Sequence, residues 1–198
     1  MILKKVHSLI SIISLSIVLG ACGTTTESEK TDQPAPTTET KNSEETVSPT
    51  NPEQELLGTT VESENQNYSI TVVDNFELTS EEPNKDLIFN QENDLQSMRI
   101  ETFDSNNETL NDVTQNLVDT LQASNDSGTV VEITDQNLIP TNESIKDAKA
   151  FQIDTPSGKV TGYTFVREGL IVKLTVFDTN ESPALETFVK MAETIKVK

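Results

Sequence analysis

The chain has 198 residues, of which 14 are basic and 33 acidic, and its formal net charge is −19. A surface this acidic disfavours nucleic acid as a partner, because contacts to phosphates need a basic patch. The sequence contains one cysteine, Cys22, and one histidine, His7. These counts exclude an internal disulfide and a metal site built from several thiolates.

The N-terminal segment has the three-part layout of an export signal. Two lysines at positions 4 and 5 precede an apolar run over residues 6–18, and residues 19–22 read Leu-Gly-Ala-Cys. The run is shorter than the roughly 20 residues that a membrane-spanning helix needs, so a retained transmembrane anchor is the weaker interpretation. The four residues that end at Cys22 resemble the lipobox of bacterial lipoproteins.

The lipobox resemblance implies that residues 1–21 are a signal peptide and that Cys22 becomes the lipidated first residue. Two acyl chains hold a protein stably at a bilayer, since each buried methylene contributes about 0.8 kcal/mol. The implied location is the extracytoplasmic face of the cell membrane, with the lipid bilayer as the partner of Cys22. Cleavage would leave 12 basic and 33 acidic residues, a net charge of −21, and would remove His7, so the mature chain would contain no imidazole.

The segment after the cysteine has a composition typical of disorder. Residues 23–55 are mostly Thr, Ser, Glu and Pro, and such a segment buries too little apolar surface to offset its ordering entropy. Its root-mean-square span as a coil would be about 30 Å. We assign residues 22–57 to the lipidated cysteine and a disordered tether, and residues 58–198 to a single folded domain. An inert spacer is the favoured role for the tether, ahead of a binding segment.

The first part of the domain shows the residue alternation typical of β-strands. In the last of these strands the alternation places Met98 and Ile100 on one face and Arg99 on the other. Asn93-Asp94 is the predicted turn before that strand. The expected strands are Tyr68–Val73, Phe76–Thr79, Asp86–Gln91 and Ser97–Phe103.

A 3.6-residue repeat of apolar positions then predicts an amphipathic helix over residues 109–124. Asn107 or Thr109 is its expected N-cap, and Asn125–Gly128 is its stop. The later strands are joined by tight turns and predict an antiparallel meander, whose last strand is apolar on both faces and therefore central. The expected strands are Thr129–Thr134, Ala148–Asp154, Lys159–Arg167 and Leu170–Asp178.

The chain closes with signals for a second helix. Ser182 is the expected N-cap, Pro183 takes the first helical position, and a buried stripe runs from Leu185 to Ala192. The order of strands, helix, strands and helix predicts an α+β fold, an antiparallel β-sheet with helices packed on it.

Three features together resemble the PsbP-like domains, which are named for an extrinsic protein of photosystem II and also occur in bacterial lipoproteins. They are the opening strand Tyr68–Val72, the meander after a mid-chain helix, and the closing stretch Phe188–Val197. Members often have a Pro-x-Gly-Trp-like turn after the first strand, of which Phe76 preserves the aromatic. The resemblance covers residues 60–198 and implies an α/β/α sandwich without a shared catalytic chemistry.

Two groups of side chains are candidates for a functional site, one for calcium binding and one for catalysis. Residues 104–108 begin like an EF-hand calcium loop, but the sixth and twelfth positions are Thr109 and Gln115 instead of Gly and Glu. We favour a helix N-cap there, assign no cofactor and leave metal binding open. Glu81 and Glu82 have the chemistry of a glycosidase acid and base, yet an acidic chain produces such pairs by chance, so we assign no catalytic residue.

The aromatic side chains are expected to pack in the core or across strands, and they are not assigned to a ligand site. They are Tyr68, Phe103, Phe151, Tyr163 and Phe165.

Two functions of different class remain. We favour a non-enzymatic binding or assembly module, displayed outside the membrane, that contacts an envelope protein or a small ligand. The alternative is a histidine-free enzyme that depends on carboxylates or a divalent cation. An exposed apolar patch would favour the module, and a cleft of converging acids with raised pKa values would favour the enzyme.

Overall fold

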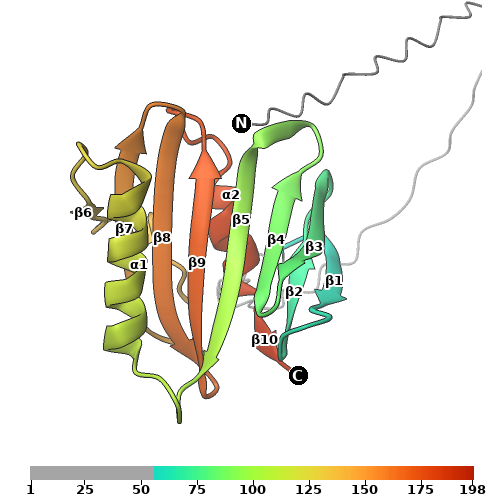
Figure 1. Ribbon diagram of the computed structural model, residues 1–198. Coiled ribbons are helices and arrows are strands. Elements are labelled where there is room, and N and C mark those ends of the chain that lie inside the picture. Colours follow the sequence, from blue (N-terminus) through green and yellow to red (C-terminus); the bar gives the residue numbers. More distant parts are fainter. Residues whose placement is uncertain (1–55) are drawn as a thin grey trace, which may run out of the picture. The chain divides into compact units, whose positions relative to one another are not determined.

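The computed structural model describes residues 56–198, and Figure 1 shows how their helices and strands are arranged. Strands predominate and two α-helices interrupt the series, which confirms the predicted α+β class. In chain order the elements are β1 (Thr59–Glu62), β2 (Tyr68–Val72), β3 (Phe76–Glu82), β4 (Lys85–Asn90), β5 (Asn93–Asp104), α1 (Leu110–Ser124), β6 (Val131–Glu132), the short 3-10 helix η1 (Gln136–Leu138), β7 (Ile145–Thr155), β8 (Gly158–Arg167), β9 (Leu170–Asp178), α2 (Leu185–Glu193) and β10 (Lys196–Val197).

The strands form two antiparallel sheets instead of the single sheet that the sequence predicts. The large sheet has seven strands in the order β3-β4-β5-β9-β8-β7-β6, and the small sheet has three in the order β1-β2-β10. β2 and β3 lie in different sheets and are joined by a tight turn, in which Asn75 has a left-handed φ of 67°. β9 is the fourth of the seven strands, which confirms its predicted central position.

The two faces of the large sheet are covered by different elements (Figure 1). α2 and the small sheet pack against one face, where the main core includes Tyr68, Ile100 and Phe188, each fully buried. α1 packs on the other face and contacts β7, β8 and β9. Leu117 and Leu121 of α1 form a second buried cluster there with side chains of β7 and β8. Within residues 56–198, no helix covers this second face over β5, β4 and β3.

Close approach of α1 to the sheet depends on a glycine in β8. A Cβ added at Gly162 would lie 2.5 Å from Leu117 Cδ1, well inside van der Waals contact. Beside it, the hydroxyls of Thr114 and Thr164 form a buried hydrogen bond of 2.8 Å between helix and strand. Small and hydroxyl-bearing residues on β8 therefore let the helix lie close to the sheet.

The structure confirms one predicted helix cap and corrects the other. The Thr109 hydroxyl accepts a hydrogen bond from Asp112 N–H at 3.2 Å, so Thr109 is the N-cap of α1. For α2 the expected Ser182 cap is wrong, because Ser182 and Pro183 precede a helix whose N-cap is Ala184. The buried Asp178 carboxylate supplies the acceptor instead, with its Oδ2 2.8 Å from Ala184 N.

Several strand bounds also differ from the expected ones. Asn93 and Asp94 open β5, and the preceding turn lies at residues 91–92, where Asn90 faces Asn93 across the hairpin. β6 contains only Val131 and Glu132 of the expected strand over 129–134. Leu56, the first described residue, packs against the main core.

Candidate functional site

The uncovered half of the large sheet presents alternate residues of β3, β4, β5 and β9, and we call it the open sheet face. Its composition follows from the strand register. Phe89 faces Ser97 across the β4–β5 pair, and Ser97 faces Phe177 across the β5–β9 pair. In the next row along the strands, the aligned residues are Leu87, Arg99 and Thr175. This face is therefore formed by residues far apart in the sequence.

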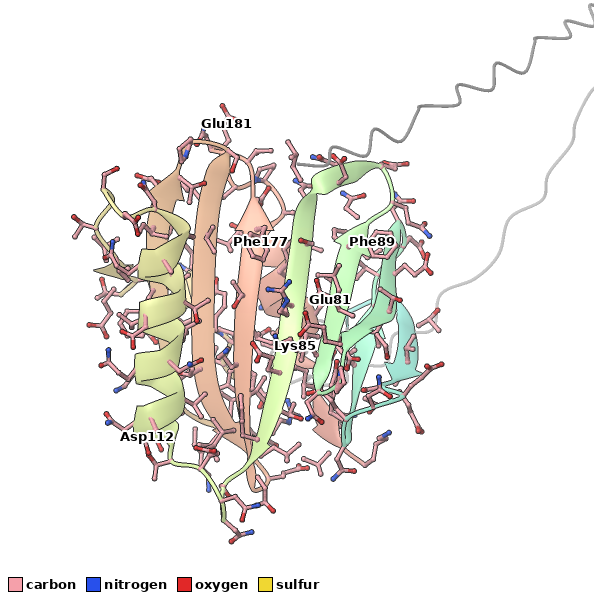
Figure 2. All side chains as sticks on the ribbon, in the orientation of Figure 1. Glu81, Lys85, Phe89, Asp112, Phe177 and Glu181 are labelled. Atoms are coloured by element: carbon pink, nitrogen blue, oxygen red, sulfur yellow. The ribbon has the colours of Figure 1, made fainter. Side chains whose placement is uncertain are left out.

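Four apolar side chains gather at one end of the open sheet face, and we call them the apolar patch: Leu87, Phe89, Leu95 and Phe177. Leu95 is 53% exposed and lies two residues before Ser97, beside the irregular end of the β4–β5 pair. Leu87, Phe89 and Leu95 belong to neither buried apolar cluster, and Phe177 touches only the edge of the second one. Figure 2 shows Phe89 and Phe177 at the same level on this face. Leu95 is the exposed member, whereas Leu87, Phe89 and Phe177 are half-buried. Apolar side chains that are grouped on a surface in this way favour an interaction site.

An ion pair between β3 and β5 lies next to the apolar patch. Both carboxylate oxygens of Glu81 accept hydrogen bonds from Arg99, from Nε at 2.5 Å and from Nη2 at 2.7 Å. The guanidinium also lies 6.0 Å from the ring centroid of Phe177. The hydrogen bonds from Arg99 hold the pKa of Glu81 below its usual range, and those to Glu81 raise the pKa of Arg99.

A β-bulge explains why two adjacent glutamates lie near bases of the open sheet face. The β3–β4 register shifts between Ser80 and Glu82, so Glu81 is the extra residue. Glu81 pairs with Arg99, and Glu82 pairs with Lys85 at 2.9 Å. The two glutamates, which were considered as a possible catalytic acid and base, are thus each paired with a different basic residue. The lowered pKa of Glu81 is the opposite of what a general acid requires.

A third ion pair lies where α1 borders the open sheet face. Lys173 is 5% exposed, and its Nζ is 2.8 Å from Glu101 Oε1 on β5 and 2.9 Å from Asn116 Oδ1 on α1. The same ammonium lies 6.0 Å from the ring centroid of Phe103. Lys173 therefore joins three elements, with its charge neutralised by Glu101.

Residues 104–108, which were compared with an EF-hand loop, form a turn that leads into the helix cap. Asp104 Oδ1 accepts from both the backbone N–H and the side-chain amide of Asn106, at 2.8 Å each. Thr109 then caps α1. Across residues 56–198, no group of three His, Cys, Asp or Glu side chains is placed to hold a metal ion. The oxygen-rich segment thus has the Asx-turn geometry that such residues adopt before a helix.

A buried carboxylate connects the two sheets on the opposite face. Asp86 of β4 is 1% exposed, and its Oδ2 accepts from Tyr68 OH and from Gln66 Nε2, each at 2.7 Å. Gln66 also accepts from Thr102 N–H at 2.7 Å. Burial, and then the hydrogen bond to Asp86, raise the pKa of Tyr68. These hydrogen bonds satisfy the buried carboxyl group of Asp86 and link β2 of the small sheet to β4 of the large one.

Two depressions of about 420 and 460 Å³ lie beyond the ends of the strands and share Asn65 and Asn84 in their linings. Side-chain amides, hydroxyls and a few acids dominate both linings, which contain no aromatic and no basic side chain. Glu81 and Glu82 line the smaller depression, where each is paired with a basic residue.

The aromatic residues divide between core and surface. Tyr68, Tyr163 and Phe165 are at most 1% exposed in the main core, as expected, and Phe151 packs on the second cluster. Phe103 belongs to neither cluster and lies on the open sheet face. The sequence analysis also missed the apolar patch, although Leu87-Ile88-Phe89 is apolar on both faces of β4 and indicates that both faces need cover.

The predicted lipidation site Cys22, the predicted signal peptide and residues 22–55 of the predicted tether lie outside the described residues. Among the helices of residues 56–198, none has the length and apolar character to cross a bilayer.

Comparison with known proteins gives likenesses of fold. No protein-family model matches the sequence, and no curated protein matches it. One similar solved structure is a protein from Bacteroides thetaiotaomicron VPI-5482, with 12% identity and a TM-score of 0.41 over 72% of this chain and 49% of that one. The chain thus spans about half the length of that protein.

A second similar structure is that of cyanobacterial PsbP (CyanoP) from Synechocystis sp. PCC 6803. Its sequence identity is 8% and its TM-score 0.49, over 71% of this chain and 92% of that one. This neighbour carries the name of the family that the sequence resembles. At such identities the likeness concerns the fold alone, and we draw no function from it.

Proposed function

We propose that the chain is a lipid-anchored binding module at the extracytoplasmic face of the cell membrane, which uses the open sheet face to contact a protein partner. The observation that carries this proposal is the apolar patch. Leu95 is more than half exposed, and Phe89 lies beside it outside both cores. Burying apolar area of this kind contributes about 25 cal/mol per Å².

Charge supports a protein as the partner. Residues 56–198 carry 25 acidic and 10 basic residues, a net charge of −15. Such a domain is repelled by phosphate groups, whether in nucleic acids or in anionic lipid head groups. A protein surface can offer both an apolar centre and a complementary charge.

The membrane anchor is proposed from the Leu-Gly-Ala-Cys motif at residues 19–22. The test is metabolic labelling of cells with an alkyne-bearing fatty acid, followed by detection of the full-length protein. We expect label on the native protein and on the control Thr24→Ala, and none on Cys22→Ala. Label that persists in Cys22→Ala, or native protein that never becomes labelled, would refute the anchor.

The binding role is tested by photo-crosslinking in intact cells. Benzoylphenylalanine replaces Leu95 in one variant and Val131 in another, and these two side chains are matched controls because they are 53% and 54% exposed. Val131 lies on β6, at the far edge of the large sheet. We expect a discrete adduct from position 95 and none from position 131. Equal yields at the two positions, or no adduct at either, would contradict the proposal.

A further inference from the structure

The uncovered part of the large sheet has the width of one helix. A helix with its side chains is about 10–12 Å wide, and neighbouring strands lie about 4.8 Å apart, so one helix covers two or three strands. α1 lies mainly over β7 and β8 and contacts β9 at its border, which leaves β5, β4, β3 and part of β9 uncovered on the same face (Figure 1). A second helix beside α1 would complete the layer.

The apolar patch lies where such a helix would pack. Phe89 on β4 and Phe177 on β9 lie on either side of Ser97, a small residue in the strand between them. Leu87 is next along β4 on the same face, and Leu95 is next along β5. The patch therefore extends along the strands, which is the direction in which helices usually lie on sheets.

Three acids without an ion-pair partner lie near the same end of the large sheet, and one of them, Glu77, accepts a hydrogen bond from the Gln91 side chain at 2.9 Å. Glu77 faces Phe89 across the β3–β4 pair, while Glu92 and Asp94 lie in and just after the β4–β5 turn. Within the described part of the chain, none of these three acids has a basic side chain within 4.0 Å. Arg99 lies next to the apolar patch, and Lys85 and Lys173 lie further along the face; each of these bases is already paired with an acid.

We infer that the open sheet face receives an amphipathic helix of a protein partner, with its apolar side on the patch and its Lys or Arg side chains against Glu77, Glu92 and Asp94. This inference rests on the proposed function and names the partner's contact element.

Two other occupants fit less well. Residues 23–55 contain only two apolar side chains, Ala35 and Val47, and four prolines, so they offer no apolar helix face. A second copy of the domain would bring another net charge of −15 to an acidic border.

The test extends the crosslinking of the full-length protein in intact cells. The adduct formed from position 95 is digested, and mass spectrometry maps the crosslinked peptide. We expect a peptide of another protein with apolar residues at helical spacing and with Lys or Arg on its flanks.

A second part of the experiment tests the contribution of charge with the triple variant Glu77→Gln, Glu92→Gln, Asp94→Asn. We expect it to lower the adduct yield about threefold to tenfold, from the lost attraction of three exposed acids. The matched control Asp119→Asn, Asp126→Asn, Glu132→Gln removes three acids from α1 and the segment after it, and it should leave the yield unchanged. Thermal unfolding followed by circular dichroism verifies that both variants fold.

The outcomes separate the two proposals. A peptide from a strand, from a second copy or from residues 1–55 of the same chain would overturn the helix, as would equal yields from the two triple variants. A position-95 adduct no stronger than that at position 131 would overturn the binding role itself.

Discussion

The two halves of one sheet face differ in what covers them. On β8 the residues beneath α1 include Gly162, which lies under Leu117, and Thr164, which is hydrogen-bonded to Thr114, so the helix lies close to the sheet. Over β5 and β4 the residues are long or aromatic, and Arg99 and Lys173 lie across neighbouring rings. The covered half thus gains stability by close packing, whereas the open half is shielded by its own side chains and keeps apolar surface accessible.

The largest expected effect is on the covered half. Leu117→Ala should lower the free energy of unfolding by about 2–5 kcal/mol, because it leaves a cavity between α1 and β8. Urea denaturation followed by circular dichroism measures the change. A loss below about 0.5 kcal/mol, the usual range for surface positions, would mean that α1 is not packed as described.

Gly162→Ala should lower the free energy of unfolding by a smaller amount, about 1–3 kcal/mol, because the new methyl group would clash with Leu117. Combining it with Leu117→Ala tests the contact directly by a double-mutant cycle in urea. The double variant should lose less than the sum of the single losses, since the shorter side chain makes room for the methyl group. Strict additivity would argue against this contact.

The ion pair between Glu81 and Arg99, in the open half, should contribute less to the free energy of unfolding than the packing at Leu117. We expect Glu81→Gln to reduce the free energy of unfolding at pH 7 by about 0.2–1 kcal/mol, the range for partly exposed pairs. The pKa of Glu81 is lowered in the folded state from the ordinary 4.5, so its contribution is present above about pH 4.5 and is lost as the pH falls through the folded pKa. Urea midpoints of both proteins should therefore converge in acid and in high salt. A constant difference across pH would point to lost packing instead.

The smallest effect on stability is expected from Leu95→Ala, within about 0.5 kcal/mol, because this side chain contacts neither core. By contrast, we expect Leu95→Ala to weaken partner binding strongly. In a protein with benzoylphenylalanine at position 89, adding Leu95→Ala should strongly lower the yield of the crosslinked adduct. The urea midpoint of unfolding should stay unchanged. A large drop in the midpoint would show that Leu95 supports the fold.

Local pattern predicted most of the strands and both helices. β9 was placed at the centre because its residues are apolar on both faces, and Thr109 was among the expected caps because its hydroxyl can reach the first turn. These features depend on neighbours within a few residues, which the sequence displays directly.

Pairing between distant residues was not predictable in the same way. β10 has two residues and exists because Lys196 and Val197 pair with β2. The α2 cap was wrong because Asp178, buried at the end of β9, provides an acceptor that no local spacing reveals. The bulge that carries Glu81 to Arg99 depends likewise on strand register.

By itself the sequence determined the order of elements, the acidity and the absence of an imidazole beyond residue 7, because composition and periodicity need no partner. Only the tertiary structure decided which apolar strand faces are covered. Leu87-Ile88-Phe89 has the same two-sided pattern as β9, but Ile88 lies in the main core while Phe89 is half-buried outside both clusters. Whether an apolar face becomes core or binding surface depends on where a distant helix packs, which local pattern does not encode.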